Sequence, residues 1–139
     1  AGLAEIARAA GLSVSATAER QKRLEERGLI LGWHAALDPA LVGVPLLAFL
    51  RLDIRPGEED AAFRARMGGI EEVLECHQLT GEWTYLVKLR VAGIAALDAL
   101  VAAEFRPLPG LERLSVEIAL ASVKETALLP VPPVPEEDE

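Results

Sequence analysis

The stretch from Glu75 to Val91 contains groups that could bind a small molecule. Two runs of alternating apolar and polar residues, typical of half-buried strands, flank a short segment of Thr80, Gly81 and Glu82. Gly81 would let the backbone take a positive φ, so that the chain can reverse there. The loop would offer backbone N–H groups and threonine hydroxyls at the rim of a sheet. A plain hairpin is the other interpretation of these residues.

A second group of candidate residues lies near the N-terminus. Apolar residues at positions 3, 6, 7 and 10 predict an amphipathic helix that Gly11 ends, and Ser13 can cap a second helix that runs to about Arg27. Two short helices joined by a tight turn match the helix-turn-helix pattern. The candidate contact residues of the second helix are Ser13, Ser15, Glu19, Lys22 and Arg23.

These side chains suit contact with double-stranded DNA. Small and hydroxyl residues at the N-terminal end of a helix let it approach base edges, and lysine or arginine further along can contact phosphate or guanine. Glu19 can accept a hydrogen bond from a cytosine amino group. A run of charge such as this is also typical of a solvated helix face, and many helical hairpins share the pattern.

Charge is distributed unevenly along the 139 residues. The formal net charge of −8 argues against non-specific nucleic-acid binding by the surface as a whole. Residues 1–34 contain five Lys and Arg against four acids, a net of +1, and the remaining residues contain nine against eighteen, a net of −9. The N-terminal part is therefore slightly basic, whereas the rest of the chain is strongly acidic.

Composition excludes several other classes of protein. The single cysteine, Cys76, cannot form an internal disulfide, which fits a reducing cytoplasm, and one Cys with two His gives no metal-ligand spacing. No apolar run reaches the ~18 residues of a membrane span, and no signal-peptide pattern is visible. No nucleophile elbow, phosphate-binding loop or paired-carboxylate site stands out. We therefore expect a cytoplasmic protein that is not an enzyme and needs no cofactor.

The remaining residues predict the elements that would position these groups. An extended segment over 29–37 is followed by a boundary at 38–43, and then by a strand over 44–54 and a helix over 58–67. The two strands around the loop, a helix over 93–105 and a strand over 111–121 complete the chain. The β-α-β-β-α-β order predicts a ferredoxin-like α+β sandwich whose helices cover one sheet face. Core-facing residues around the loop are expected at Leu74, Cys76, Tyr85, Val87, Leu89 and Val91, with Gln78 as a further candidate.

We thus expect three parts in the chain. Residues 1–37 form the helix-turn-helix head and a linker strand, 38–124 form the sandwich, and 125–139 form a proline-rich, acidic and mobile tail. The uncovered face of the sheet still carries large apolar residues. Since such a face is an interaction surface, we expect a homodimer built through it, with larger assemblies of dimers as an alternative.

Three segments, GLSVSATAERQKRLEERGLI, GWHAALDPALVG and ECHQLTGEWTYLVKLRV, occur in this order. Together they closely resemble the leucine-responsive/asparagine regulator (Lrp/AsnC) family, over nearly the whole chain up to Lys124. The resemblance implies a bacterial or archaeal transcriptional regulator with a winged-type helix-turn-helix and a sandwich that binds a small effector, usually an amino acid. Family members form dimers that often assemble into octamers. The family's first helix, which would precede Leu3, has no counterpart in this sequence.

The resemblance also implies an effector site between dimers, near the glycine loop after the second strand. The expected effector contacts are Thr80, Gly81, Glu82, Trp83 and Thr84 in the loop, and Leu114 and Val116 on the last strand. Thr84 stands where the family commonly has aspartate, and Leu114 and Val116 stand where polar residues commonly point toward the effector. A lost carboxylate removes a strong partner for an ammonium group, and the added apolar residues favour an apolar effector or none.

Two other functions are compatible with the sequence. Gln21 stands where the family has an aliphatic residue, and together with the missing first helix it favours an effector-binding or assembly module with a vestigial DNA-binding head. Haem-precursor decarboxylases also resemble this family, but they rely on histidines in the sheet domain, where this chain has only His77. A DNA-binding regulator is the main hypothesis.

Overall fold

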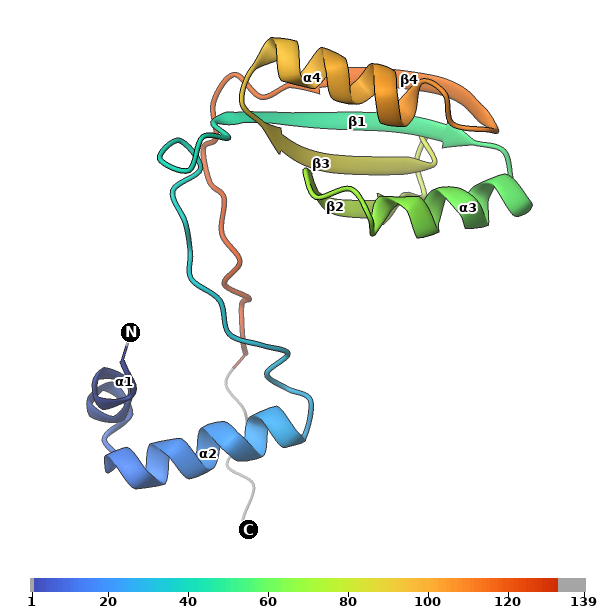
Figure 1. Ribbon diagram of the computed structural model, residues 1–139. Helices are drawn as coiled ribbons and strands as arrows, with labels where there is room; N and C mark the ends of the chain where they lie inside the picture. The colour runs from blue at the N-terminus through green and yellow to red at the C-terminus, as the bar shows by residue number, and fades with distance from the viewer. Residues whose placement is uncertain (1, 133–139) are drawn as a thin grey trace. The chain divides into compact units, whose positions relative to one another are not determined.

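The computed structural model describes residues 2–132 and divides the chain into two compact units, residues 1–37 and 38–139 (Figure 1). The first unit contains helices α1 (Leu3–Ala10) and α2 (Val14–Glu26). The second contains β1 (Leu46–Ile54), α3 (Glu58–Met67), β2 (Val73–Gln78), β3 (Tyr85–Val91), α4 (Ile94–Leu100), the π-helical η1 (Val101–Phe105) and β4 (Leu111–Ile118). Within the described residues, no helix is both long and apolar enough to cross a bilayer.

Local signals in the sequence form the helix-turn-helix. Gly11 takes a φ of 70° at the end of α1, a conformation that glycine adopts readily. The Ser13 hydroxyl caps α2 by accepting a hydrogen bond from the Ala16 N–H at 3.1 Å. Thr17 is buried and donates its hydroxyl to the Ser13 carbonyl at 2.9 Å. These contacts hold the turn between the two helices.

The linker strand expected over residues 29–37 is not formed. Residues 31–38 have no regular secondary structure and pair with no strand in the described part of the chain. A strand needs a neighbour to complete its ladder of hydrogen bonds, and the single chain offers none here. His34 is exposed, as expected for a connecting residue, and the Trp33 indole donates a hydrogen bond to Glu25 at 2.5 Å.

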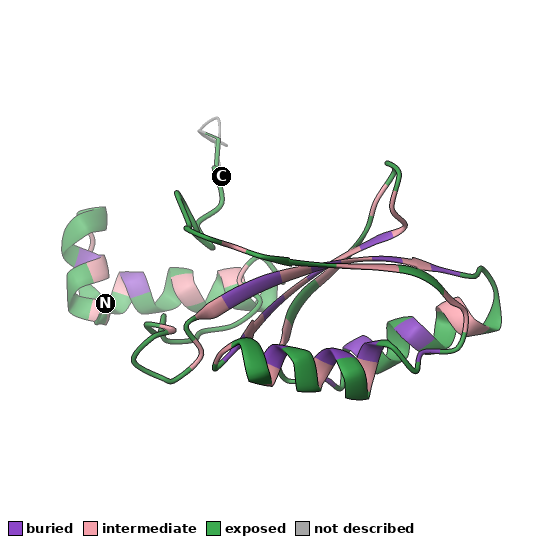
Figure 2. Ribbon diagram, turned by 90° about the horizontal axis from the view of Figure 1, so that it is seen from above, coloured by how far each residue is buried: buried purple, intermediate pink, exposed green. Residues whose placement is uncertain are grey.

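The second unit is a four-stranded antiparallel sheet in the order β2-β3-β1-β4. β1 lies inside the sheet and pairs with both β3 and β4. The helices of this unit lie on one face of the sheet, with their buried residues turned toward it (Figure 2). The ferredoxin-like sandwich predicted from the order of elements is therefore confirmed.

Alternation along the strands decides which side chains enter the core. Every second residue of β1 and β3 points toward the helices, as the period of two requires. Phe63 of α3 and Phe105 of η1 close the core from the helical side. The fully buried strand residues include Leu50, Leu52, Val87 and Leu89.

The helix after β3 changes from α to π geometry after Leu100. Leu97, Val101 and Phe105 follow one another at intervals of four residues, and all three are buried. Four residues overshoot an α-helical turn by about 40°, so such a row drifts around a regular helix. The wider turn, with a hydrogen bond from the Arg106 N–H to the Val101 carbonyl at 2.9 Å, returns Phe105 to the sheet.

β2 departs from simple alternation. Its pairing with β3 shifts register between Val73 and Glu75. Val73 and Cys76 pack against the core, whereas Leu74 is 52% exposed, so the prediction of a core-facing Leu74 was wrong. A bulge adds one residue to a strand and moves the side chains before it to the other face. Burial raises the pKa of the Cys76 thiol, which fits its expected role as a small apolar residue.

The face of the sheet opposite the helices, here called the open face, mixes apolar and charged residues. Leu47, Phe49 and Leu86 lie among four basic side chains that each pair with an acid. These ion pairs are Arg51–Glu117, Lys88–Glu75, Arg90–Glu125 and Arg113–Asp53. The open face is therefore close to neutral in a chain whose net charge is −8.

Residues 119–126 cross part of the open face after β4 ends. The Ala119 N–H donates a hydrogen bond to the Leu47 carbonyl at 2.9 Å. Glu125 binds Arg90 at 2.7 Å and Lys88 at 2.8 Å, so the contacts of the sandwich extend to this residue. The mobile tail was expected to begin at Glu125, which these two ion pairs hold on the open face, and its residues 133–139 lie outside the described residues.

Substituting Leu50 tests the core. Leu50 is fully buried, so Leu50→Ala is expected to lower the free energy of unfolding by about 2–5 kcal/mol. Leu41 lies in the same unit and is 86% exposed, so Leu41→Ala is expected to change it by less than about 0.5 kcal/mol. Urea unfolding followed by circular dichroism measures both. Equal effects of the two substitutions would contradict this core.

Candidate functional site

The segment between β2 and β3 is a loop of residues 79–84 rather than a tight turn. The Leu79 N–H donates to the Thr84 carbonyl at 2.8 Å and closes the loop. Gly81 is not among the glycines with positive φ in residues 2–132, so the prediction for its backbone was wrong. A longer loop reverses gradually and needs no left-handed residue there. A Cβ added at Gly81 would meet no atom within 4 Å, so the space beside it is open to an incoming group.

Asp53, at the end of β1, holds the loop in place. Its Oδ1 accepts hydrogen bonds from the Thr84 N–H at 2.9 Å and from the Thr84 hydroxyl at 3.0 Å. Arg113 of β4 donates from Nε to Oδ2 of the same carboxylate. Although burial acts to raise it, the pKa of Asp53 lies below its ordinary value because Arg113 and Thr84 donate hydrogen bonds to the ionised form. One carboxylate thus joins β1, β4 and the loop.

Arg113 connects β4 to the outer part of the loop. Its Nη2 donates to the Glu82 carbonyl at 3.1 Å, and its Nη1 lies 3.4 Å from the Glu82 carboxylate. Its Cζ lies 4.0 Å from the centroid of the Trp83 ring, a cation–π contact. Sequence reasoning missed Asp53 and Arg113, because strand pairing brings them to the loop and no local motif marks either residue.

A cavity of about 330 Å³ lies beside the loop. It is lined by Asp53, Ile54, Pro56, Gly57, Asp60, Gln78, Thr84 and Glu112. Its size falls at the lower end of the ~300–1,000 Å³ of small-molecule sites. Its three carboxylates each pair with an arginine as well: Asp53 with Arg113, Asp60 with Arg64 at 3.2 Å, and Glu112 with Arg55 at 3.9 Å. Since a carboxylate can accept several hydrogen bonds, these groups can still receive an N–H of a ligand such as an ammonium.

Tyr85, which follows the loop, orients one wall of this cavity. Its buried hydroxyl donates to Asp60 Oδ1 at 2.5 Å and accepts from Arg64 Nε at 2.7 Å. Arg64 also donates to the Gln78 side chain at 2.6 Å. Burial raises the pKa of Tyr85, and its hydrogen bond to Asp60 acts in the same direction. The hydroxyl therefore stays protonated and holds the Asp60 carboxylate in position.

The structure separates the residues expected around the effector. Thr80, Gly81 and Glu82 are exposed on the loop, and Trp83 and Thr84 are half-buried. Leu114 and Val116 lie on the helix side of β4, where Leu114 packs against the core and Val116 lines another cavity beside α4. They do not reach the loop within the chain, because alternation along β4 turns Arg113 toward it instead.

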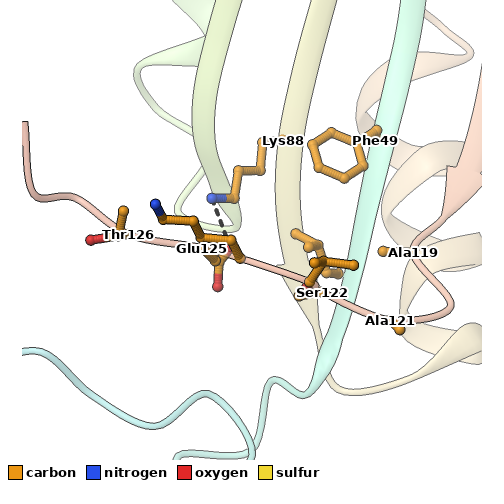
Figure 3. A pocket seen from close by; sticks show the side chains of 10 residues that line it. Phe49, Lys88, Ala119, Ala121, Ser122, Glu125 and Thr126 are labelled. Carbon is orange, nitrogen blue, oxygen red and sulfur yellow. Dashed lines mark ion pairs between the residues drawn. The ribbon is translucent and has the colours of Figure 1, made fainter. Parts of the chain in front are cut away.

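A larger cavity of about 530 Å³ lies on the open face, beneath residues 119–126 (Figure 3). Leu47 and Phe49 give it an apolar floor, and the ion pair of Lys88 with Glu125 lies at its edge. It shares no lining residue with the loop cavity. It is therefore separate from the loop cavity and belongs to the open face. His77, on the same face, donates a hydrogen bond from Nε2 to the Glu75 carboxylate at 2.8 Å.

The helix-turn-helix presents its candidate contacts to solvent. Thr17, Gln21 and Leu24 turn inward on α2 and line a cavity of about 220 Å³ with residues of α1. The opposite side is free to meet a partner, although the Ser13 hydroxyl is already engaged as the helix cap. The exposed candidate contacts are Ser13, Ser15, Glu19, Lys22 and Arg23.

Comparison with known protein sequences identifies both units. Residues 3–30 match a winged helix-turn-helix DNA-binding domain, and residues 47–129 match the Lrp/AsnC ligand binding domain. The leucine-responsive regulatory protein of Haemophilus influenzae is 35% identical over 127 residues, which cover 90% of this chain and 76% of its own. The transcriptional regulator LrpA of Mycobacterium tuberculosis is 43% identical over 102 residues, covering 73% of this chain and 67% of its own.

Solved structures agree with this result. A transcriptional regulator from Neisseria meningitidis in complex with L-methionine has a TM-score of 0.87 and 30% identity, covering 94% of this chain and 85% of its own. A feast or famine regulatory protein from M. tuberculosis, also complexed with L-methionine, has a TM-score of 0.77 and 35% identity, covering 92% and 86%. The named sequence relatives are regulators of transcription rather than enzymes. The chain therefore belongs to the Lrp/AsnC family, as a transcriptional regulator with a DNA-binding helix-turn-helix and a ligand-binding sandwich.

Proposed function

We propose that this regulator binds specific DNA through α2 and responds to an amino acid bound at the loop of residues 79–84. The observation that carries the effector part is the acidic cavity of about 330 Å³ beside that loop. Two structural relatives solved with L-methionine support an amino acid as the ligand class. We also propose that it acts in the cytoplasm, where the DNA of a bacterial or archaeal cell lies.

In this proposal α2 lies in the major groove. Ser13 and Ser15 meet phosphate or base edges, Glu19 accepts from a cytosine amino group, and Lys22 and Arg23 contact phosphate or guanine. Two copies related by a dimer axis would bind a pseudo-palindrome whose half-sites are one or more helical turns apart. The acidic second unit disfavours loose binding and so keeps the protein off random DNA.

Removing a basic side chain from α2 tests the DNA interface. Lys22→Ala and Arg23→Ala are each expected to weaken binding to a DNA site selected from a random pool. Each lost phosphate contact should reduce the slope of log affinity against log salt by about 1. Fluorescence anisotropy over a salt series measures both quantities.

Arg106→Ala is the matched control, because it removes the same charge from an exposed position of the second unit on the helix side, away from the open face. It is expected to leave the salt slope unchanged. A wild-type chain with no salt slope and no preferred site would instead support the effector-binding module with a vestigial head.

The effector site in this proposal lies between the loop and the acidic cavity. An amino-acid ammonium would meet Asp60 and Glu112, which supply the negative charge that Thr84 does not. Trp83 offers an apolar surface for the effector's side chain. Thr80, Gly81 and Glu82 form the exposed rim that the effector passes or contacts. Leu114 and Val116 lie outside this part of the site, since they face the helices.

Gly81→Ala tests the loop without disturbing the fold. The free energy of unfolding is expected to stay unchanged or rise slightly, because a methyl group at Gly81 meets nothing within 4 Å and no positive φ is involved. Amino-acid binding is expected to weaken about tenfold or more, since the methyl group occupies the ligand's approach, and a tenfold loss corresponds to ~1.4 kcal/mol. Isothermal titration calorimetry with L-methionine and the other standard amino acids measures this.

Gly69→Ala is the control for a glycine away from the loop, because its Cβ would make only an ordinary contact, 3.6 Å from the Arg66 carbonyl oxygen. It should bind amino acids as the wild type does. Wild-type affinity in Gly81→Ala would remove the loop from the effector site.

We further propose that two copies pair through the open face, and that such dimers can assemble into octamers. Phe49 and Leu86, which are half-buried, supply apolar area on this face, and the balanced ion pairs reduce the repulsion expected between chains of net charge −8. A patch that serves both partners of a two-fold dimer must be self-complementary, which a neutral and partly apolar face allows.

Phe49→Glu tests this interface. A charge placed on the neutral face is expected to shift the protein toward monomers, as measured by analytical ultracentrifugation at several protein concentrations. Leu41→Glu adds the same charge at a site 86% exposed in a turn, and should leave the assembly state unchanged. Circular dichroism checks that both variants are folded. An unchanged sedimentation coefficient in Phe49→Glu would rule out the open face as the interface.

A further inference from the structure

We propose that Arg113 determines the effector's chemical class by binding its carboxylate, and that the Glu82 carboxylate is the group this ligand displaces. The inference rests on the proposed amino-acid site at residues 79–84. It assigns a role to a residue on β4 that sequence patterns did not mark.

The nitrogens of the Arg113 guanidinium differ in how well their hydrogen bonds are satisfied. Its Nε donates to Asp53, and its Nη2 donates to the Glu82 backbone carbonyl at 3.1 Å. Its Nη1 faces only the Glu82 carboxylate, at 3.4 Å. Charge-assisted N–H···O bonds are usually about 2.7–2.9 Å, so this contact is weak. One donor of Arg113 is therefore available to a better carboxylate.

Solvent exposure supports Glu82 as the carboxylate that a ligand displaces from Arg113. The Glu82 side chain is 78% exposed, against 43% for Arg113 and 18% for Asp53. An exposed ion pair contributes little, because water screens it and both side chains lose freedom. An incoming carboxylate can replace Glu82 while the Asp53 contact stays intact.

The remaining contacts hold Arg113 ready for a ligand. Asp53 fixes one side of the guanidinium, and the Trp83 ring lies against its face at 4.0 Å. An arginine already held in this way loses less side-chain freedom when it binds a carboxylate, and its planar fork matches carboxylate geometry. Pre-organisation of this kind raises both affinity and selectivity.

The position of the cluster selects a zwitterion. Asp53 and Thr84 belong both to the Arg113 cluster and to the wall of the acidic cavity. Arg113 itself does not line that cavity, so an amino acid with its carboxylate on Arg113 would have its ammonium at the cavity's edge, beside Asp53 and Thr84. Amines, amino alcohols and esters lack the carboxylate, and the geometry disfavours all of them.

The test compares ligands that differ only in the carboxylate. Isothermal titration calorimetry of the full chain would use L-methionine, its methyl ester and L-methioninol, after the panel of standard amino acids has shown which one binds best. If another amino acid binds best, its own ester and alcohol replace those of methionine. The wild type is expected to bind the acid about tenfold or more tightly than the ester, a difference of ~1.4 kcal/mol.

Variants separate carboxylate recognition from loop structure. Arg113→Gln is expected to bind the acid and the ester equally, whereas a purely structural role would weaken both and keep their ratio. Arg113→Lys keeps the charge and should retain part of the preference. Glu82→Gln is expected to bind the acid more tightly, because the competing carboxylate is gone. Thermal unfolding and DNA affinity check that each variant is folded.

The outcomes distinguish this inference from the proposed function. If no amino acid binds the wild type, the effector site itself fails and Arg113 has no ligand. If amino acids bind and Arg113→Gln keeps the preference for acid over ester, only the role of Arg113 is overturned. A weaker affinity of Glu82→Gln for the acid would overturn the displacement of Glu82.

Discussion

The alternation of side chains along β1 is the constraint on which the second unit depends. Because β1 pairs with β3 and β4, its two faces are fixed together with theirs. Leu50 and Leu52 enter the core, and Asp53 falls on the open face opposite Arg113. Shifting the pairing by one residue would exchange these faces and expose the core residues. The same register that packs the core therefore places the carboxylate that holds the loop.

The two faces of the sheet serve different purposes. The helix side is a continuous apolar core, whereas the open face combines apolar residues with paired charges. The Arg51–Glu117 pair is exposed at both side chains and adds little to folding stability, whereas Lys88, Arg90 and Asp53 are 20% exposed or less. The clearer effect of these ion pairs is to cancel charge on one surface of an acidic protein, so that surface can approach a copy of itself. Glu125 extends this neutral network beyond the last strand, since it binds both Lys88 and Arg90.

Local patterns predicted the order of elements, because period-two strands and capped helices have short-range signals. The helix-turn-helix followed from Gly11 and Ser13 in the same way. What failed depends on pairing or on distant residues. The bulge before Glu75 turned the Leu74 side chain to the opposite face of the sheet. The loop made a left-handed Gly81 unnecessary, and the linker strand had no pairing partner in the described part of the chain. Asp53 and Arg113 meet only after the sheet has formed, so no spacing in the sequence could mark them.

The position of the proposed site indicates how an effector could control assembly. Asp53 and Arg113 lie at the loop end of the open face, so a ligand on Arg113 would lie at the edge of the surface on which two copies would pair. A ligand shifts an equilibrium only by its difference in affinity between the two states. Replacing the exposed Glu82 carboxylate on Arg113 by a ligand gives such a difference, if pairing alters access to the loop. Effector binding would then act by shifting the equilibrium between assembly states, which needs no direct contact between the loop and the helix-turn-helix.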